Sequence, residues 1–200
     1  MIDFDKIWVE KYRPTTLDDI ILDERTLKQV KEFKEEIPNL LFVGNPGTGK
    51  TTLARIIVND VLGCNYLYIN ASDESGIDTI RHSITNFAQT KSFDGKVKVV
   101  ILDEADGLTT QAQSALRNTM ETYAKYCRFI LTANYKHKII PALQSRCQAL
   151  DIKPVVELAV KRCYNILKDE KITVPEEQKK KFVQLVKRHF PDLRKTINEL

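Results

Sequence analysis

The sequence predicts an α/β domain, with a parallel sheet covered by helices on both faces, followed by a small domain made only of helices. Up to about residue 152, short apolar runs alternate with segments of helical pattern, which is typical of a chain that passes repeatedly from strand to helix. After Lys153 and Pro154 only helical patterns follow. We therefore divide the chain into domains of residues 1–152 and 153–200.

The expected strands are short runs that are almost wholly apolar, as in strands buried on both faces. They are Leu40–Val43, Tyr66–Asn70, Val97–Leu102, Phe129–Ala133 and Ala149–Ile152. The helices expected between them are Thr51–Val61, Ile77–Gln89, Gln111–Tyr123 and a shorter one near Pro141–Ser145. In the second domain we expect helices at Val155–Asp169, at Pro175–His189 with Pro175 at its start, and from Pro191 and Asp192 onward.

Composition indicates an ordinary folded protein of one or two domains, with 200 residues that are 42% apolar and 29% charged. The chain shows neither an apolar run long enough to span a membrane nor the pattern of a signal peptide. We therefore expect no membrane partner and a cytoplasmic location. The four cysteines form no Cys-x-x-Cys pair, which favours reduced thiols over a zinc site or disulfides.

The net charge of +4 is unevenly distributed. Residues 1–150 carry 19 charges of each sign, whereas residues 151–200 carry 12 basic and 8 acidic side chains. A basic cluster lies on the helix expected at 175–189, and we favour a solvated helix face over a nucleic-acid site as its explanation. Charge alone therefore does not indicate a nucleic-acid partner.

The run Gly-Asn-Pro-Gly-Thr-Gly-Lys-Thr-Thr at residues 44–52 has the spacing of a phosphate-binding loop. It joins an apolar run to a helical pattern, as that motif requires. Glycines let the backbone turn tightly, so that N–H groups point at phosphate oxygens at the positive end of the helix. The lysine then reaches the β- and γ-phosphates. We expect this loop to bind ATP together with Mg²⁺. The residues predicted to bind the nucleotide are Gly47, Thr48, Gly49, Lys50, Thr51 and Thr52.

Two adjacent carboxylates, Asp103 and Glu104, follow the apolar strand at 97–102. In a chain with a phosphate-binding loop, this strand end is where hydrolysis requires acidic groups. We expect Thr51 and Asp103 to hold Mg²⁺ and Glu104 to orient the attacking water. An acidic helix start would explain a single such carboxylate, but it does not explain the pair.

Three further polar residues are candidates for contacts with the phosphates. Asn134 ends the strand at 129–133, where its amide would help to position the water, although a strand-end Asn also suits a turn. Arg146 and Arg194 are candidates for neutralising the charge of the transition state. Each arginine by itself is equally compatible with a surface position.

Seven segments together resemble one family, the small ATPase subunits of sliding-clamp loaders within the AAA+ superfamily. These include replication factor C and the large subunit of the T4-type phage clamp loader. The segments are Trp8–Pro14, Gly44–Thr52, Asn70–Ile77, Leu102–Asp106, Thr132–Asn134, Ser145–Cys147 and Pro191–Lys195. The resemblance implies an AAA+ phosphate-loop domain followed by a helical lid domain.

The resemblance also implies roles for individual residues. Tyr12 and Pro14 look like the adenine-side segment, Asn134 resembles sensor 1, Arg194 resembles sensor 2, and Arg146 resembles the arginine finger that completes a neighbouring subunit's site. The residues implied to contact DNA are Ser75, Thr79 and Arg81. The implied partners are a sliding clamp, primer–template DNA and other loader subunits in a pentameric spiral.

Different segments resemble different branches of this family. The segments at 85–95 and 190–197 favour the phage type, whereas those at 70–74 and 102–106 favour replication factor C, and we favour a phage protein in the host cytoplasm over a nuclear one. The family's collar domain is expected to be missing after residue 200. Two alternatives stay open: another DNA-associated AAA+ ATPase, such as a Holliday-junction motor or helicase loader, and an architectural loader subunit that does not hydrolyse ATP.

Overall fold

The structure is a computed structural model that describes residues 7–34, 36–72, 77–90 and 95–200. Its strands are β1 (Leu40–Val43), β2 (Tyr66–Asn70), β3 (Lys98–Asp103), β4 (Cys127–Ala133) and β5 (Gln148–Asp151). The α-helices of the first part are α1 (Trp8–Lys11), α2 (Glu24–Glu32), α3 (Lys50–Ile56), α4 (Ile77–Gln89), α5 (Thr110–Thr122) and α6 (Pro141–Gln144). The second part contains α7 (Val156–Asp169), α8 (Lys179–His189) and α9 (Leu193–Asn198).

The five strands form one sheet in the order β2-β3-β4-β1-β5, and each neighbouring pair is parallel. Because the strands are parallel, their carboxyl ends lie along one edge of the sheet. This order places the end of β1 beside the end of β4, and the end of β3 on the other side of β4. The loop after β1 therefore lies close to the residues that follow β3 and β4. The predicted fold class is confirmed.

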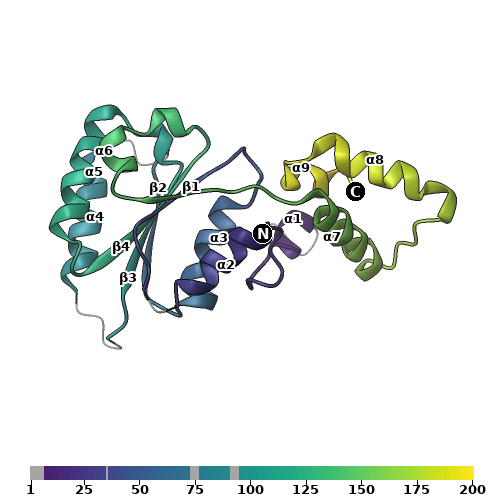
Figure 1. Ribbon diagram of the computed structural model, residues 1–200, viewed down its shortest axis with the longest axis horizontal. Helices are drawn as coiled ribbons and strands as arrows, with labels where there is room; N and C mark the ends of the chain where they lie inside the picture. Colours follow the sequence, from purple (N-terminus) through teal and green to yellow (C-terminus); the bar gives the residue numbers. More distant parts are fainter. Residues whose placement is uncertain (1–6, 35, 73–76, 91–94) are drawn as a thin grey trace.

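Helices cover both faces of the sheet, with α4, α5 and α6 on one side and α2 and α3 on the other (Figure 1). Successive strand residues point to opposite faces. In β4, for example, Phe129 and Leu131 pack under α4 and α5, whereas Ile130 packs against α3. This alternation explains why the strands read as continuous apolar runs.

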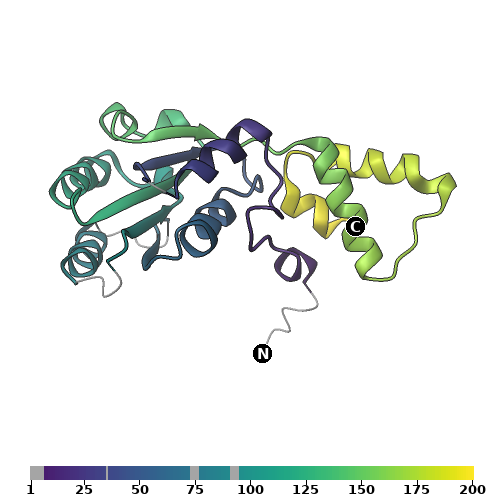
Figure 2. The same cartoon turned by 60° about the horizontal axis from the view of Figure 1, so that its bottom comes forward.

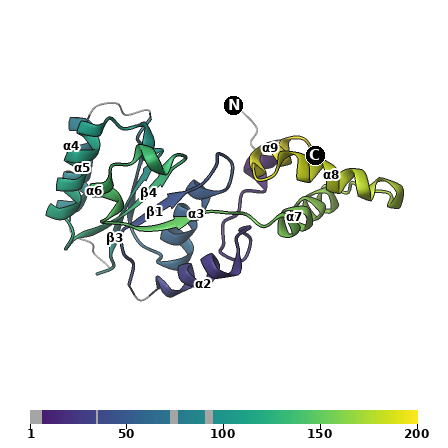
Figure 3. The same cartoon turned by 45° about the horizontal axis from the view of Figure 1, so that its top comes forward.

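The lid helices α7, α8 and α9 form a separate layer at one end of the molecule, beyond the sheet (Figures 1 and 2). Their small core is built on Ala159, Cys163 and Val186. Ile21 from the N-terminal segment packs into the same core. The short helix α1 lies beside α9 (Figure 3). The N-terminal segment therefore contacts the lid, although the two lie at opposite ends of the sequence.

Several elements differ from the sequence-based expectation. The helix expected at 51–61 is α-helical only to Ile56 and continues as a π-helical turn at Ile57–Val61. Pro175 precedes a short 3-10 helix, Glu176–Gln178, which leads into α8. Helices α1 and α2 were not expected. Within the described residues, no helix combines the length and apolarity needed to cross a membrane.

Candidate active site

A cavity of about 360 Å³ lies between the sheet edge, the lid and the N-terminal segment. The lining comes from the loop after β1 and the helix α3 that follows it, from β2 and the ends of β3 and β4, from the N-terminal segment, and from helices α7 and α9. The residues predicted from sequence to bind nucleotide, metal or water converge here. They are Tyr12, Pro14, Gly47, Thr48, Gly49, Lys50, Thr51, Thr52, Asp103, Glu104, Asn134 and Arg194.

Lys50 is the first residue of α3 and is held by three oxygen atoms. Its ammonium donates to the carbonyls of Gly44 at 2.8 Å and Asn45 at 2.9 Å, and to the side-chain Oδ1 of Asn134 at 2.8 Å. Gly49 precedes it with a φ of +93°, a conformation that side chains rarely adopt. Burial lowers the pKa of Lys50, and the nearby carboxylate of Asp103 opposes this effect. Three oxygen acceptors therefore hold the buried ammonium beside the loop.

Asp103 is the polar centre beside this loop. Its carboxylate accepts from the hydroxyl of Thr51 at 2.8 and 2.9 Å, from Tyr68 at 2.8 Å and from Thr132 at 2.5 Å. Burial, together with the hydrogen bond to Asp103, raises the pKa of Tyr68 to about 12. A hydroxyl and a carboxylate that meet beside a phosphate-binding loop are hard oxygen donors of the kind that Mg²⁺ prefers. The donor set therefore fits this ion.

Glu104 follows Asp103 with its backbone in the left-handed region, at a φ of 55°. Its N–H donates to the hydroxyl of Thr132 at 3.0 Å, and its carboxylate accepts from the hydroxyl of Ser72. The unusual backbone conformation separates the two adjacent carboxylates: Asp103 is buried, whereas Glu104 is exposed to the cavity. The two acids are therefore placed for different roles.

The lid contacts the phosphate-binding loop directly. The N–H of Leu193, at the start of α9, donates to the carbonyl of Gly47 at 3.0 Å. Gly47 has a φ of +76°, and a Cβ built on it would lie 1.9 Å from Oδ1 of Asp192. Asp192 also caps α9 by accepting from the N–H of Lys195 at 2.9 Å. This contact brings Arg194 to the cavity.

Comparison with known proteins identifies the family. Residues 40–154, more than half of the chain, match the family described as "ATPase family associated with various cellular activities (AAA)". The chain belongs to the AAA family. Residues 151–200 of this AAA protein match a second family, described as "Sliding-clamp-loader large subunit, AAA+ ATPase lid domain".

Among curated proteins, the AAA chain is 44% identical to the replication factor C small subunit of Archaeoglobus fulgidus, over 98% of this chain and 63% of that protein. It is 41% identical to replication factor C subunit 3 of Saccharomyces cerevisiae, over 96% of this chain and 58% of that protein. These relatives confirm the resemblance to clamp-loader small subunits. The chain spans about three fifths of their length.

Among solved structures, the RuvB Holliday junction branch migration motor of Thermotoga maritima superimposes with a TM-score of 0.74. The alignment covers 94% of this chain and 63% of that chain, at 19% identity. At this identity the similarity shows a shared AAA fold and nothing more.

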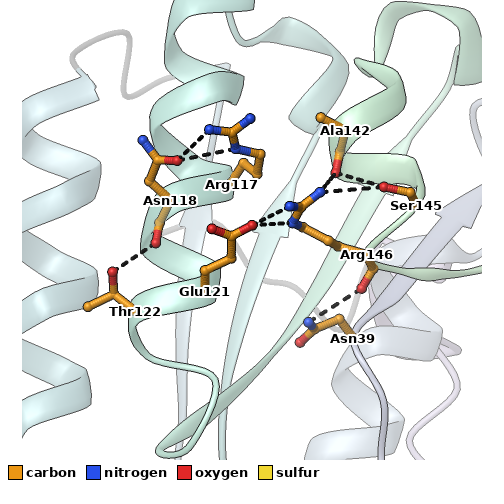
Figure 4. A network of polar contacts seen from close by, with 8 residues as sticks. All are labelled: Asn39, Arg117, Asn118, Glu121, Thr122, Ala142, Ser145 and Arg146. Atoms are coloured by element: carbon orange, nitrogen blue, oxygen red, sulfur yellow. Dashed lines mark hydrogen bonds and ion pairs between the residues drawn. The ribbon is translucent and has the colours of Figure 1, made fainter.

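Arg146 does not line the cavity. It lies after α6, where its Nε donates to the carboxylate of Glu121 on α5 at 2.7 Å and its Nη1 donates to the carbonyl of Ala142 at 2.8 Å (Figure 4). A second guanidinium nitrogen contacts the same oxygen of Glu121. The Arg146 side chain is 36% exposed. The structure therefore separates Arg146 from the other predicted site residues.

The residues implied to contact DNA are described only in part. Ser75 lies outside the described residues, and residue 79 is described only as part of the α4 backbone. Arg81 is an exposed residue of the same helix.

Sequence reasoning missed several residues that line the cavity, and Arg13, Arg55, Tyr68 and Arg162 are among them. The guanidinium of Arg55 lies 4.7 Å from the centre of the Tyr68 ring. Arg13 stands inside a segment that the sequence did single out, at 8–14. The other three lie within helices or strands, and no local pattern distinguishes them from surface or core residues.

Proposed function

We propose that this chain is the ATPase subunit of a sliding-clamp loader, which uses ATP binding and hydrolysis to open a sliding clamp and place it on primer–template DNA. The supporting observation is that one cavity gathers a phosphate-binding loop, a carboxylate pair and Arg194 from a lid that matches clamp-loader lids. We place the boundary between the nucleotide-binding domain and the lid at residues 152 and 153.

In this proposal the residues of the cavity have different roles in the binding and hydrolysis of ATP. The N–H groups of the loop and the ammonium of Lys50 bind the phosphates. Thr51 and Asp103 hold Mg²⁺, which supplies positive charge to the phosphate oxygens. Glu104 orients the attacking water and accepts its proton, and Asn134, tied to Lys50, helps to fix the geometry. Arg194 contacts the bound nucleotide from the lid. Tyr12 and Pro14 form the wall beside the base.

Arg146 acts in the site of a neighbouring subunit. Its exposed position outside its own cavity supports this role, because a residue so placed meets nucleotide only across an interface. ATP held between Lys50 of one subunit and Arg146 of the next favours a spiral of five subunits, which binds DNA through Ser75, Thr79 and Arg81. Loss of the γ-phosphate removes these contacts and releases the loaded clamp.

Two alternative functions are less well supported. A Holliday-junction motor would share the fold, as the RuvB similarity shows, but the curated relatives at 41–44% identity bear replication factor C names. An architectural subunit would have no need of the full set of Lys50, Thr51, Asp103 and Glu104. Both alternatives are therefore less well supported than clamp loading.

The experiment measures ATP turnover by the chain in its assembled complex, first alone and then with a sliding clamp and primer–template DNA. The proposal predicts that clamp and DNA together stimulate turnover well above either alone. Stimulation by a four-way DNA junction in place of clamp and primer would support a branch-migration motor. Binding of ATP without turnover under all conditions would support the architectural subunit.

A further inference from the structure

Two side chains of the lid hold the N-terminal segment beside the cavity. Arg162, in the middle of α7, donates from Nη2 to the backbone carbonyl of Tyr12 at 3.2 Å, and its Nη1 lies 3.5 Å from the carboxylate of Asp19. Glu170, directly after α7, accepts from the hydroxyl of Tyr12 at 2.8 Å and from the ammonium of Lys11 at 2.6 Å. The lid thus grips Tyr12 through both its backbone and its side chain.

These contacts are partly shielded from water. The Arg162 and Glu170 side chains are 26% and 22% exposed. Hydrogen bonds from Lys11 and Tyr12 lower the pKa of the Glu170 carboxyl, so Glu170 remains a charged acceptor at neutral pH. Attachment of one residue at two points restricts both the path of the backbone and the orientation of the ring. Tyr12 is therefore fixed relative to α7.

The fixed segment forms a distinct sector of the cavity wall. Next to the charged loop around Lys50, the N-terminal segment and the lid supply an apolar lining of Val9, Pro14, Ile20, Ile21, Cys163 and Ile197. Phosphate oxygens gain nothing from such a surface, whereas the flat faces of a purine do. The base of a nucleotide whose phosphates lie on the loop is therefore expected in this sector.

We infer that Arg162 and Glu170 are positioning residues for the base: they hold Tyr12 and the segment that follows it as a rigid base-side wall attached to the lid. The inference rests on the proposed function, because it concerns the same nucleotide site. It adds that the affinity for the phosphates and the affinity for the base depend on different parts of the cavity. The loop binds the phosphates, and the wall that contacts the base keeps its position only while Arg162 and Glu170 hold Tyr12.

The division can be tested with two ligands that share phosphates but differ in the base. Calorimetry in the presence of Mg²⁺ gives the Kd of ATP and of inorganic tripolyphosphate for the wild type and for Arg162→Gln and Glu170→Gln. We expect the Kd of ATP to rise on the order of 10-fold in each variant, because an unfixed wall must be ordered when the base binds. The Kd of tripolyphosphate should stay within about 2-fold of the wild-type value.

A matched control comes from a second acid–base pair of the lid. Glu176 lies 2.5 Å from Lys179 at the start of α8, and neither lines the cavity. Glu176→Gln removes an ion pair within the lid that does not reach the N-terminal segment, and it should leave both Kd values unchanged. Tyr12→Phe deletes only the hydroxyl that donates to Glu170, so it gives a second test of that contact if Glu170→Gln does not fold. Arg162→Lys keeps the positive charge and should recover part of the ATP affinity that Arg162→Gln loses.

The outcomes separate the inference from the proposed function. If ATP and tripolyphosphate weaken equally in Arg162→Gln and Glu170→Gln, or if neither weakens, the base-positioning role is wrong while nucleotide binding stands. If the wild type binds neither ligand, the proposed function itself fails, and this inference fails with it.

Discussion

The guanidinium of Arg146 and the carboxylate of Glu121 form an ion pair that joins the segment after α6 to the last turn of α5 (Figure 4). The pair is open to solvent, with side-chain exposures of 36% and 51%. The arginine that we propose to act on a neighbour's nucleotide therefore already has an anionic partner within its own subunit. If phosphate takes the same N–H groups, Arg146 has to exchange one anion for the other.

The first prediction concerns this exchange. Glu121→Gln should change the free energy of unfolding by less than about 1 kcal/mol, because exposed ion pairs contribute little. In the assembled complex, turnover should be equal to or higher than that of the wild type, because Arg146 no longer leaves a carboxylate. Thermal denaturation and a steady-state ATPase assay measure the two quantities. A loss of turnover as large as that of Arg146→Ala would mean that Glu121 positions Arg146 rather than competing for it.

The second prediction concerns Lys50. Lys50→Ala should weaken ATP binding on the order of 100-fold or more, because the phosphates lose their main charged hydrogen-bond donor. Calorimetry measures the affinity, and Lys180→Ala, an exposed lysine of α8, controls for the loss of one positive charge. Equal ATP affinity in the wild type and Lys50→Ala would overturn the assignment of the phosphate-binding loop.

The third prediction concerns the contact between loop and lid. Gly47→Ala should lower both the melting temperature and the ATP affinity, because its Cβ would collide with Asp192 and push α9 off the loop. Gly95 is the matched control: it also has a positive φ, of +67°, but a Cβ there meets nothing within 4 Å. Gly95→Ala should therefore show only the backbone cost, on the order of 1 kcal/mol, and unchanged ATP affinity. Equal effects of the two substitutions would argue against the clash.

The fourth prediction separates ATP binding from hydrolysis. Glu104→Gln should keep ATP affinity close to that of the wild type but slow turnover by roughly 10²- to 10⁴-fold, because the water loses its general base while Asp103 is retained. Binding is measured by calorimetry and turnover by phosphate release. Turnover at the wild-type rate would remove Glu104 from the catalytic role.

Much of the fold could be predicted because local patterns and global structure agree. The apolar runs at 40–43 and 66–70 coincide with β1 and β2, and the helix expected at 77–89 has the bounds of α4. Helix α2 was overlooked although Asp23 caps it through the N–H of Thr26 at 3.0 Å, a spacing visible in the sequence. The π-helical turn after Ile56 has no comparable local signal.

The candidate site could be predicted wherever chemistry lies in contiguous motifs. The loop around Lys50 and the acidic residues after β3 are each contiguous in the sequence, and the parallel strands bring them together in the fold. Arg162, Glu170 and Glu121 were missed because their partners are distant in sequence: 150 residues separate Arg162 from Tyr12, and 25 separate Glu121 from Arg146. Such pairs depend on how the lid and helices pack, which no single segment encodes.

The most direct test of the account is the ATP turnover of assembled mixtures of Arg146→Ala and Glu104→Gln subunits. Each variant alone should be nearly inactive, because every site lacks either the arginine from the neighbour or the general base. In mixed assemblies, some interfaces pair the intact Glu104 of one subunit with the intact Arg146 of the next, and turnover should recover in part. A mixture as inactive as its components, or an Arg146→Ala subunit with full clamp- and DNA-stimulated activity, would contradict the account.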